Sequence, residues 1–352
     1  MEHQMKNALI IGATGFGGLG LIEILIKHPG IRIQQLVARK DTGVPISNVF
    51  PHLRGYCDMT VDSPEEIKYD GVDLAFFSTP DRAGMAIIDP FLMRNIPVID
   101  FSGDFRFKNE KEYEIYARNK GMEENHLYPD ALKDSVYGLP EKYENLISKA
   151  KIIGNPGCFA ICMLLGLLPA VEGNIIESDT IICDGKTGVS GAGKNSGEAN
   201  LYPQRYENVN TYREGRHQHT VEVENIINSS GKNPKKILFI PHLVPINRGI
   251  LVTIYADLTE NGKKTDIMEL YRNYYKEKPF VQLTEKSPNT TDVRGSNRCL
   301  IRPSIDKRTG KLFITSVIDN LLKGQAGNAV QNANIILGLD QKTGLNFPGN
   351  YP

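Results

Sequence analysis

The sequence predicts an α/β protein in which an N-terminal parallel sheet is followed by a second domain of the α+β class. Short apolar strands alternate with helical stretches through residues 1–150, and a glycine-rich turn joins the first strand to the first helix. Further strands follow one long apolar helix after residue 150. Because 352 residues suit two domains of ordinary size, we expect the first over residues 1–150 and the second over 151–319.

The composition narrows the class of function. Forty-one basic and 41 acidic side chains balance, so no net charge favours nucleic acid or an anionic membrane surface as a partner. The longest apolar run, residues 158–171, is shorter than the roughly 20 residues that span a bilayer. The polar N-terminus has no apolar core of signal-peptide length, and we expect a cytoplasmic protein. Five scattered cysteines suggest neither a disulfide framework nor a metal site.

The first element is a strand at residues 8–11, and a helix with leucines and isoleucines at helical spacing follows at 19–28. Between them the sequence reads GATGFGG, with glycines at positions 12, 15 and 18 instead of the usual GxGxxG spacing. Glycines at such a turn let the backbone approach a pyrophosphate, whose charge the following helix N-terminus binds. We therefore predict a Rossmann-type dinucleotide-binding domain with cofactor contacts at Gly12, Thr14, Gly15, Phe16 and Gly17.

The end of the second strand, residues 33–38, points to the kind of dinucleotide. An NAD-binding unit is expected to carry an acidic residue here, whereas a basic residue accommodates the 2′-phosphate of NADP. The strand ends in Arg39-Lys40. The sequence therefore predicts NADP(H) as the cofactor and these two residues as contacts; the alternative is a solvated basic pair at a strand end.

Two more strands, residues 72–77 and 97–100, continue the alternating pattern. In a parallel doubly wound sheet, ligands bind at the C-terminal ends of the strands. The first of these strands is followed by Ser78-Thr79-Pro80, and we expect Ser78 and Pro80 to contact the cofactor. The second is followed by a polar segment that ends in Arg106.

A strand at residues 151–153 leads through Asn155-Pro156-Gly157 to Cys158, the first residue of the long apolar helix. Free backbone N–H groups and the helix dipole favour negative charge at this position. A helix N-terminus is one of the settings that lower a cysteine pKa toward neutrality, so Cys158 is a candidate nucleophile. The alternative is a buried structural cysteine, because free cysteine packs as a small apolar side chain in most proteins.

The second domain is expected to contain strands at residues 180–183, 237–240, 249–256 and 312–318. A glycine-rich segment with two lysines, residues 184–194, follows the first of them and is either an anion-binding nest or a flexible loop. Thr220 is a plausible N-cap for a helix at 221–227, which would place His217 and His219 in an extended segment with their side chains on one face. We interpret them as a general acid/base beside a thiolate; the alternative is two surface histidines.

Residues 319–334 open a helix whose first turns are almost all small or amide side chains. Small residues on a helix let another backbone or a flat ligand come close. We expect this C-terminal helix, within about residues 320–352, to pack back on the first domain and to line the nicotinamide pocket.

Together the motifs resemble the N-acetyl-γ-glutamyl-phosphate reductases, the arginine-biosynthesis branch of the aspartate-semialdehyde dehydrogenase group. The resemblance covers nearly the whole chain. It rests on GATGFGG at 12–18, FPHLRG at 50–55, DFSGDFR at 100–106, YGLPE at 137–141, NPGC at 155–158, KTGVSGAGK at 186–194, HQHT at 217–220, PHLVPINRGIL at 241–251 and DNLLKGQAGNAVQN at 319–332.

The resemblance implies a two-domain NADPH enzyme, a homodimer or homotetramer, whose second domain is catalytic and mediates dimerisation. It implies Cys158 as the nucleophile, Arg106 on the substrate phosphate and His219, slightly favoured over His217, as the acid/base. The expected substrate contacts are Arg106, Lys186, Ser190, Lys194 and Arg216. The expected cofactor contacts of the second half are Ser190, Gly191, Asn320 and Asn328.

The expected reaction is the NADPH-dependent reductive dephosphorylation of N-acetyl-γ-glutamyl phosphate to N-acetylglutamate 5-semialdehyde, with inorganic phosphate released and a cysteine thioester between. One alternative is a related reductase acting on N-succinylglutamyl, aminoadipyl or aspartyl phosphate. A thiol hydrolase or acyltransferase would also use a cysteine and a histidine, and the first domain alone would suit a dinucleotide sensor.

Overall fold

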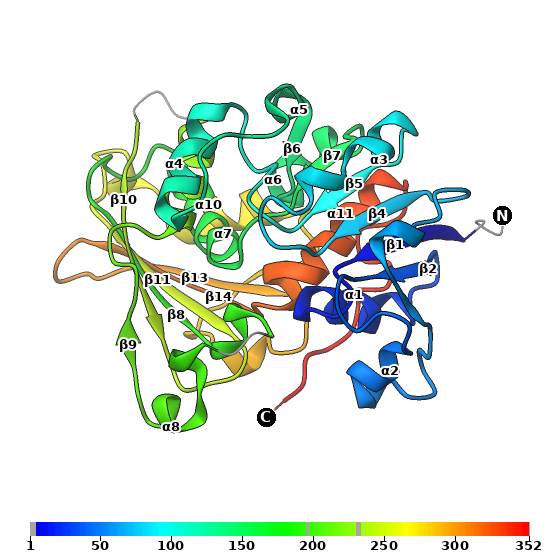
Figure 1. Ribbon diagram of the computed structural model, residues 1–352. Coiled ribbons are helices and arrows are strands. Elements are labelled where there is room, and N and C mark those ends of the chain that lie inside the picture. Colours follow the sequence, from blue (N-terminus) through cyan, green and yellow to red (C-terminus); the bar gives the residue numbers. More distant parts are fainter. Residues whose placement is uncertain (1–4, 195–196, 230–233, 352) are drawn as a thin grey trace. The chain divides into compact units, whose positions relative to one another are not determined.

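The computed structural model describes residues 5–194, 197–229 and 234–351. Residues 1–4 and 352, at the ends of the predicted first domain and of its C-terminal addition, lie outside them. The chain forms two compact units (Figure 1). The first comprises the residues up to Tyr113, Asn125–Pro156 and Gln325–Phe347; the second comprises Glu114–Glu124, Gly157–Gly324 and the residues from Pro348.

The first unit is built on a seven-stranded sheet in which every neighbouring pair of strands is parallel. Its order is β3-β2-β1-β4-β5-β7-β6. The strands are β1 (Lys6–Ile11), β2 (Ile31–Val37), β3 (Val61–Asp62), β4 (Leu74–Phe77), β5 (Val98–Asp100), β6 (Ser135–Tyr137) and β7 (Ile152–Gly154). Because β1 lies between β2 and β4, the chain reverses its direction of travel across the sheet at β1, which is the switch point where such sheets bind ligands.

The helices of the first half connect these strands. They are α1 (Phe16–Leu25), α2 (Ile46–Val49), α3 (Asp89–Met93), α4 (Glu110–Lys120), α5 (Pro129–Asp134) and α6 (Pro140–Ile147). Near the end of the chain, α11 (Gly327–Ile336) belongs to the same unit and packs against α1, α6 and β5. The α/β prediction with a parallel Rossmann-type sheet is confirmed for this half.

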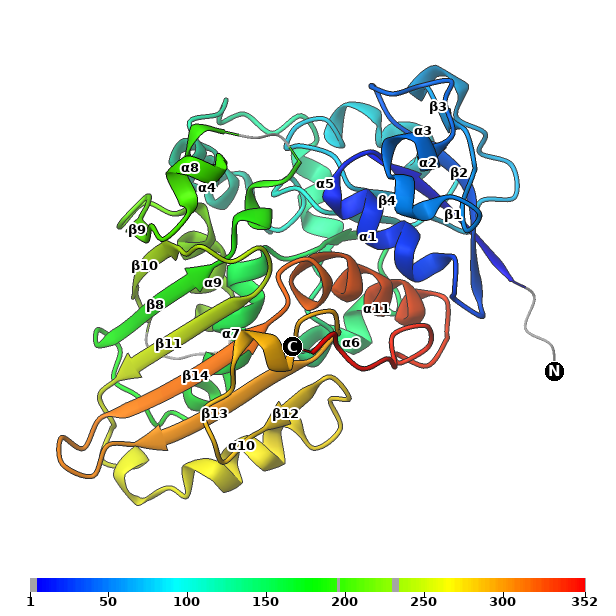
Figure 2. The same ribbon diagram turned by 90° about the horizontal axis from the view of Figure 1, so that it is seen from below.

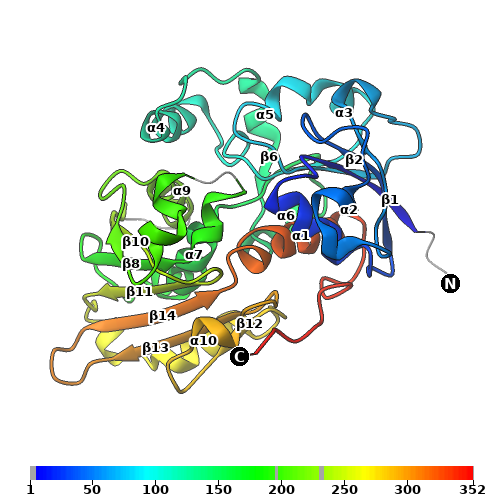
Figure 3. The same cartoon turned by 60° about the horizontal axis from the view of Figure 1, so that its bottom comes forward.

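The second unit contains a mixed seven-stranded sheet of order β12-β13-β14-β11-β8-β10-β9, whose central strands run side by side in Figure 2. The strands are β8 (Ile181–Thr187), β9 (Asn210–Thr211), β10 (Ile237–Leu243), β11 (Ile250–Ala256), β12 (Val281–Leu283), β13 (Cys299–Ile305) and β14 (Leu312–Ile318). Helices α7 (Cys158–Glu172) and α9 (Gln218–Asn228) lie on one face of this sheet (Figure 3), and α10 (Ile267–Tyr275) packs against α7. The α+β prediction for this half is also confirmed.

Helix α7 is the core of the second unit, and every residue from Phe159 to Val171 in it is buried. Pro169 lies inside the helix and cannot donate the hydrogen bond that the Leu165 carbonyl would otherwise accept. The Tyr275 hydroxyl from α10 donates to that carbonyl instead. The neighbouring Tyr271 hydroxyl donates to the Gly166 carbonyl at 2.7 Å. Two tyrosines therefore satisfy backbone groups in an otherwise apolar interior.

The opposite face of the second sheet is exposed along its central strands. Ile182, Leu238 and Tyr255 are 41%, 50% and 39% exposed, which is unusual for large apolar side chains on regular strands. Strand register places Ile182 beside both Leu238 and Tyr255. The three form one apolar row across β10, β8 and β11.

Among the described residues, no helix combines the length and the apolar character that crossing a membrane requires.

Candidate active site

The candidate nucleophile lies where the chain passes between its two units. Strand β7 ends at Gly154, Pro156 is the last residue of the first unit at this crossing, and α7 begins at Cys158. Cys158 is partly exposed, whereas the other four cysteines, Cys57, Cys162, Cys183 and Cys299, are buried. Cys158 is thus the one thiol with access to solvent, and it lies at the helix N-terminus, where backbone N–H groups favour a thiolate.

The prediction that His217 and His219 share an extended segment is wrong, because His219 lies inside a helix. Helix α9 begins at Gln218, His217 is its N-cap and Thr220 lies inside its first turn. The Nδ1 atom of His217 accepts a hydrogen bond from the His219 backbone N–H at 3.2 Å. An imidazole nitrogen here takes the place of the usual serine, threonine or aspartate oxygen, and for this reason residue preferences misplaced the cap.

The His219 side chain lies against the turn Asn155-Pro156-Gly157 that precedes Cys158, here called the nucleophile turn. A Cβ atom built on Gly157 would be 2.1 Å from Nε2 of His219, so the imidazole occupies the space beside the residue that precedes Cys158. Any side chain at position 157 would displace the ring. The glycine of the Asn155-Pro156-Gly157 turn therefore admits a histidine to within contact distance of the helix start.

His217 is more deeply enclosed. It is 2% exposed, and its ring contacts the rings of Tyr212, Phe159 and Phe239 at centroid distances of 5.7, 5.9 and 5.1 Å. Burial, with a smaller effect of the neighbouring His219, lowers the pKa of His217 to about 2. His217 is therefore a neutral imidazole, and because its Nδ1 accepts a hydrogen bond, its proton lies on Nε2.

Helix α9 brings a second group to the same turn. The Oε1 atom of Glu222 accepts a hydrogen bond from the Gly157 backbone N–H at 2.8 Å, and the side chain is 1% exposed. Sequence reasoning missed this residue. Its signal was the spacing of three from His219, which places both side chains on one face of a helix.

Arg106 lies in the first unit and is held by backbone carbonyls. Its Nε donates to the Asn155 carbonyl at 2.8 Å and its Nη2 to the Phe101 carbonyl at 2.6 Å. The Asn155 side chain is fixed in turn, because its Oδ1 accepts from Asn328 and Asn332 at 2.8 and 3.3 Å. The amide groups of α11 thus fix the peptide that orients Arg106.

Asn328 and Asn332 have a further shared partner. Each Nδ2 also donates to the Gly138 carbonyl, at 2.7 and 2.9 Å. Both side chains are fully buried. The small and amide residues that the sequence shows at the start of this helix serve, in this structure, to bind neighbouring loops of the first unit.

The glycine-rich turn between β1 and α1 fits a dinucleotide phosphate. Gly12 has φ of +87°, and a Cβ there would lie 2.2 Å from the Ser78 carbonyl oxygen. A Cβ on Gly18 would lie 2.5 Å from the Gly12 carbonyl oxygen, so close packing requires both glycines. Gly15, by contrast, meets nothing nearer than 3.5 Å. Its open side, beside the N-terminus of α1, is where an anion can approach the backbone.

Other predicted cofactor residues surround this turn. The Ser78 hydroxyl lies close to Gly17, since a Cβ on Gly17 would be 2.4 Å from its oxygen. Arg39 and Lys40 are exposed just beyond the C-terminal end of β2, the strand beside β1. The partly exposed Thr14 belongs to the same turn, the partly exposed Phe16 is the first residue of α1, and the exposed Pro80 lies two residues after Ser78.

The predicted residues of the second half fall into separate places. Ser190 and Asn320 lie together: the Ser190 hydroxyl accepts from Nδ2 of Asn320 at 3.0 Å. Gly185 on β8 faces Phe159 of α7, so Lys186 points to the opposite face of the sheet, where it pairs with Asp184 at 2.8 Å. The structure therefore does not bring Lys186 to Cys158. Gly191, Lys194 and Arg216 are exposed.

Across residues 5–194, 197–229 and 234–351, no group of three or more histidine, cysteine, aspartate or glutamate side chains is arranged to hold a metal ion.

Comparison with known proteins identifies the family. Residues 7–150 match the semialdehyde dehydrogenase NAD binding domain, and residues 158–320 match the semialdehyde dehydrogenase dimerisation domain. N-acetyl-gamma-glutamyl-phosphate reductase from Oceanobacillus iheyensis is 39% identical over 99% of this chain and 100% of its own length. The proteins of the same name from Citrifermentans bemidjiense and Bacillus cytotoxicus are 38% and 40% identical over the same shares.

Solved structures agree on the fold. Aspartate semialdehyde dehydrogenase II from Vibrio cholerae superposes with a TM-score of 0.72 at 21% identity, covering 95% of this chain and 99% of its own. Aspartate semialdehyde dehydrogenase with NADP from Candida albicans has a TM-score of 0.65 at 16% identity, covering 95% and 98%. The resemblance inferred from the motifs is confirmed. The chain belongs to the semialdehyde dehydrogenase family and, within it, to the N-acetyl-γ-glutamyl-phosphate reductases.

Proposed function

We propose that this protein catalyses the NADPH-dependent reductive dephosphorylation of N-acetyl-γ-glutamyl phosphate to N-acetylglutamate 5-semialdehyde, a step of arginine biosynthesis. The observation that carries the proposal is the partly exposed Cys158 at the start of α7 with the His219 imidazole against the preceding glycine. Curated relatives about 40% identical over the full chain are named for this activity. A cytoplasmic location suits a biosynthetic step of this kind.

Covalent catalysis divides the reaction into two steps. The Cys158 thiolate attacks the carbonyl carbon of the acyl phosphate, the C–O bond to phosphate breaks, and the departing phosphate takes up one proton from solvent. The product is a thioester on Cys158. NADPH, when bound, would supply the hydride for reduction of the thioester carbonyl. Cleavage of the C–S bond of the resulting hemithioacetal releases the aldehyde and restores the Cys158 thiolate. We assign the backbone N–H groups at the start of α7 to the stabilisation of the developing oxyanion.

His219 is our candidate for the general acid/base. It protonates the developing alkoxide as the hemithioacetal forms and takes the proton back when the hemithioacetal collapses. Two observations favour it over His217. The His219 ring contacts the nucleophile turn, and His217 has a pKa lowered to about 2, too low for an imidazolium that donates a proton near neutral pH. We assign His217 the role of fixing the start of α9.

Arg106 is our candidate for the substrate phosphate. A guanidinium matches the geometry of phosphate oxygens and balances the charge that develops as phosphate leaves. Two of its nitrogens are already used on backbone carbonyls, which fixes the orientation of the guanidinium plane before substrate arrives. Ser190, Lys194 and Arg216 remain expected substrate contacts.

The first unit is proposed to bind NADP(H), and the second to carry the nucleophile and the dimer contacts. The residues that would hold the cofactor are the Gly12–Gly15 turn for the pyrophosphate and Arg39 and Lys40 for the 2′-phosphate. For self-association, the apolar row of Ile182, Leu238 and Tyr255 offers an exposed apolar surface on the sheet of the dimerisation domain. A solution mass equal to a single chain would contradict a dimer.

Arg39→Gln/Lys40→Gln is expected to raise the KM for NADPH about 10- to 100-fold, because charge-assisted hydrogen bonds to the 2′-phosphate are lost. The KM for NADH, which lacks that phosphate, is expected to change little. Arg32→Gln is the matched control, since Arg32 lies at the other end of β2. Steady-state kinetics with both cofactors measure the change. An equal effect on NADPH and NADH would contradict the assignment.

The activity is tested with a panel of N-acetylglutamate, N-succinylglutamate, aminoadipate and aspartate semialdehydes, each with NADP⁺ and inorganic phosphate. We expect the N-acetylglutamate compound to give the highest kcat/KM, with no turnover when phosphate is omitted. A higher value for another semialdehyde would assign the enzyme to that acyl phosphate. Phosphate release from acyl phosphates without oxidation of NADPH would indicate a hydrolase, and cofactor binding without turnover of any compound would indicate a sensor.

A further inference from the structure

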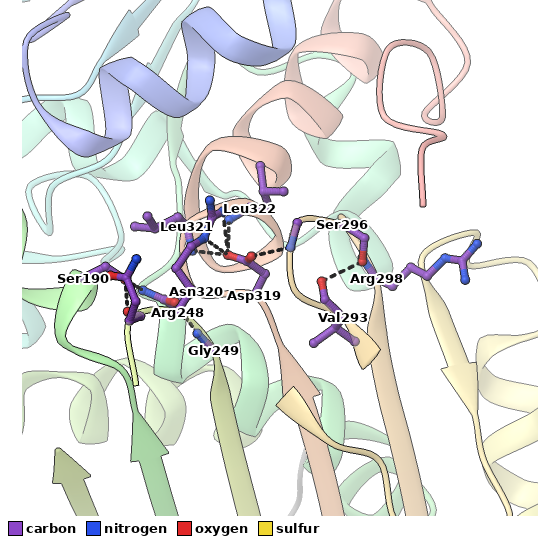
Figure 4. A network of polar contacts seen from close by, with 12 residues as sticks. Ser190, Arg248, Gly249, Val293, Ser296, Arg298, Asp319, Asn320, Leu321 and Leu322 are labelled. Carbon is purple, nitrogen blue, oxygen red and sulfur yellow. Dashed lines mark hydrogen bonds and ion pairs between the residues drawn. The ribbon is translucent and has the colours of Figure 1, made fainter. Parts of the chain in front are cut away.

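The carboxylate of Asp319, fully buried just after β14, accepts hydrogen bonds from several segments of the second unit. Asp319 Oδ1 accepts hydrogen bonds from Arg248 Nη2 at 3.0 Å and from the backbone N–H groups of Leu321 and Leu322 at 2.9 and 3.2 Å. Its Oδ2 accepts from the Gly295 N–H at 2.7 Å. Figure 4 shows these contacts converging on one side chain. Asp319 thereby joins two loops and the turn that follows it.

The next residue extends the network to the Ser190 loop. Asn320 Oδ1 accepts from the Gly249 N–H at 2.7 Å, and its Nδ2 donates to the Ser190 hydroxyl at 3.0 Å (Figure 4). The Ser190 hydroxyl donates to the Asn247 carbonyl at 2.6 Å. Both ends of the Asn320 amide therefore bind protein, and the side chain serves as a tie between segments.

The turn that Asp319 caps lies directly against the nucleophile. It forms a single π-helical turn, Leu322–Ala326, and the Gly324 N–H donates to the Asp319 carbonyl at 2.9 Å. A Cβ built on Gly324 would lie 2.9 Å from Cβ of Cys158 and 3.4 Å from its Cα. The Gly324 backbone therefore forms one wall of the space that the cysteine side chain occupies. Single π-helical turns occur often at functional sites.

We propose that Asp319, paired with Arg248, is a positioning residue for Cys158. Its carboxylate holds the first N–H groups of the turn, and the turn in turn confines the cysteine side chain. A buried carboxylate keeps one arrangement of its donors because each lost hydrogen bond leaves a buried polar group unsatisfied. The nucleophile is thus constrained from a segment some 160 positions further along the chain, in addition to its own helix.

The test uses four substitutions in the full-length protein. Asp319→Asn keeps the size of the side chain and one oxygen for the turn, but removes the charge that pairs with Arg248. Arg248→Gln removes the other partner, and Arg248→Lys keeps the positive charge and is expected to restore part of the effect. Gly324→Ala adds a methyl group against Cys158 without changing any charge.

Asp257→Asn is the matched control, because Asp257 forms an exposed ion pair with Lys311 in the same unit. The first readout is alkylation by iodoacetamide, which requires neither substrate nor cofactor. In Asp319→Asn we expect Cys158 to react about threefold faster or more, because a loosened turn exposes the thiol. The four buried cysteines are expected to stay unlabelled, which peptide mass spectrometry checks.

The second readout is turnover, which rests on the proposed function. We expect kcat per titrated Cys158 to fall about 10- to 100-fold in Asp319→Asn and Gly324→Ala, because a displaced nucleophile loses its alignment with the carbonyl. The KM values are expected to stay within about twofold, since substrate binding is unchanged. A variant that lost only stability would keep kcat per titrated thiol.

The proposal is overturned if Asp319→Asn matches the Asp257→Asn control in both alkylation rate and kcat. Labelling of all five cysteines in Asp319→Asn would also overturn it, since Asp319 would then maintain the fold alone. If the unsubstituted enzyme turns over none of the semialdehydes but the alkylation rates differ as expected, the proposed function fails while the positioning role stands.

Discussion

Replacing Cys158 with serine is expected to lower kcat for phosphate-dependent oxidation of N-acetylglutamate 5-semialdehyde by about 10³-fold or more. The serine hydroxyl is not ionised near neutral pH, so the helix N-terminus has no anion to stabilise at this position. Cofactor binding is expected to persist, because Cys158 and the glycine-rich turn belong to different units. Steady-state absorbance of NADPH measures kcat, and stopped-flow measurement on the same sample follows cofactor binding.

Cys162→Ala is the matched control for this substitution. Cys162 lies one turn further along α7, is fully buried and donates its thiol hydrogen to the Ser316 carbonyl at 3.2 Å. Its removal is expected to lower the free energy of unfolding while most of kcat is retained. A Cys158→Ser enzyme that oxidised the semialdehyde at the unsubstituted rate would exclude the thioester mechanism.

His219→Asn is expected to lower kcat about 10²- to 10⁴-fold with little change in KM, because the hemithioacetal oxygen loses its proton donor and acceptor. The substitution preserves a polar side chain of moderate size beside Gly157. It removes the imidazole that we propose as proton donor and acceptor. The pH dependence of kcat is expected to lose the corresponding limb, which a profile between pH 5 and 9 measures.

His217→Asn is the informative partner of that experiment. Asparagine is a good N-cap, and its Oδ1 replaces the Nδ1 acceptor that binds the His219 N–H. We therefore expect a smaller loss of kcat and an unchanged pH profile, since His217 is already neutral over this range. Inactive His217→Asn together with active His219→Asn would reverse the two assignments.

Much of the first unit was predictable because local signals coincide with tertiary structure there. A strand, a glycine-rich turn and a helix follow one another within 20 residues as predicted, although α1 begins at Phe16 and so includes the last three residues of the GATGFGG motif. The backbone packs so closely at Gly12 and Gly18 that no Cβ fits there. The need for glycine at these positions is therefore visible in the sequence itself. The start of α7 at Cys158 was visible for the same reason, as a turn of glycine and proline followed by an apolar run.

The remaining features depend on an uncommon helix cap or on partners far apart in the chain. His217 caps α9 with an imidazole nitrogen, which residue preferences do not predict. Helix α9 therefore begins earlier than expected and includes His219. The hydrogen bond from Gly157 to Glu222 spans 65 positions. Strand β13 (Cys299–Ile305) contains a proline and was not predicted, although it pairs with β14 through its whole length. The role proposed for Asp319 likewise depends on the contact between the turn that it caps and Cys158, which is distant in the sequence.

Passage of the reaction through a thioester on Cys158 can be tested by trapping that thioester. The enzyme is mixed with N-acetylglutamate 5-semialdehyde and NADP⁺ without phosphate, so that hydride transfer proceeds but the acyl group has no acceptor. We expect a burst of one NADPH per active site and an added N-acetylglutamyl mass on the peptide that contains Cys158; added phosphate is expected to remove the acyl group and to start steady turnover. Steady turnover without an adduct, or an adduct on any other residue, would contradict passage through a Cys158 thioester.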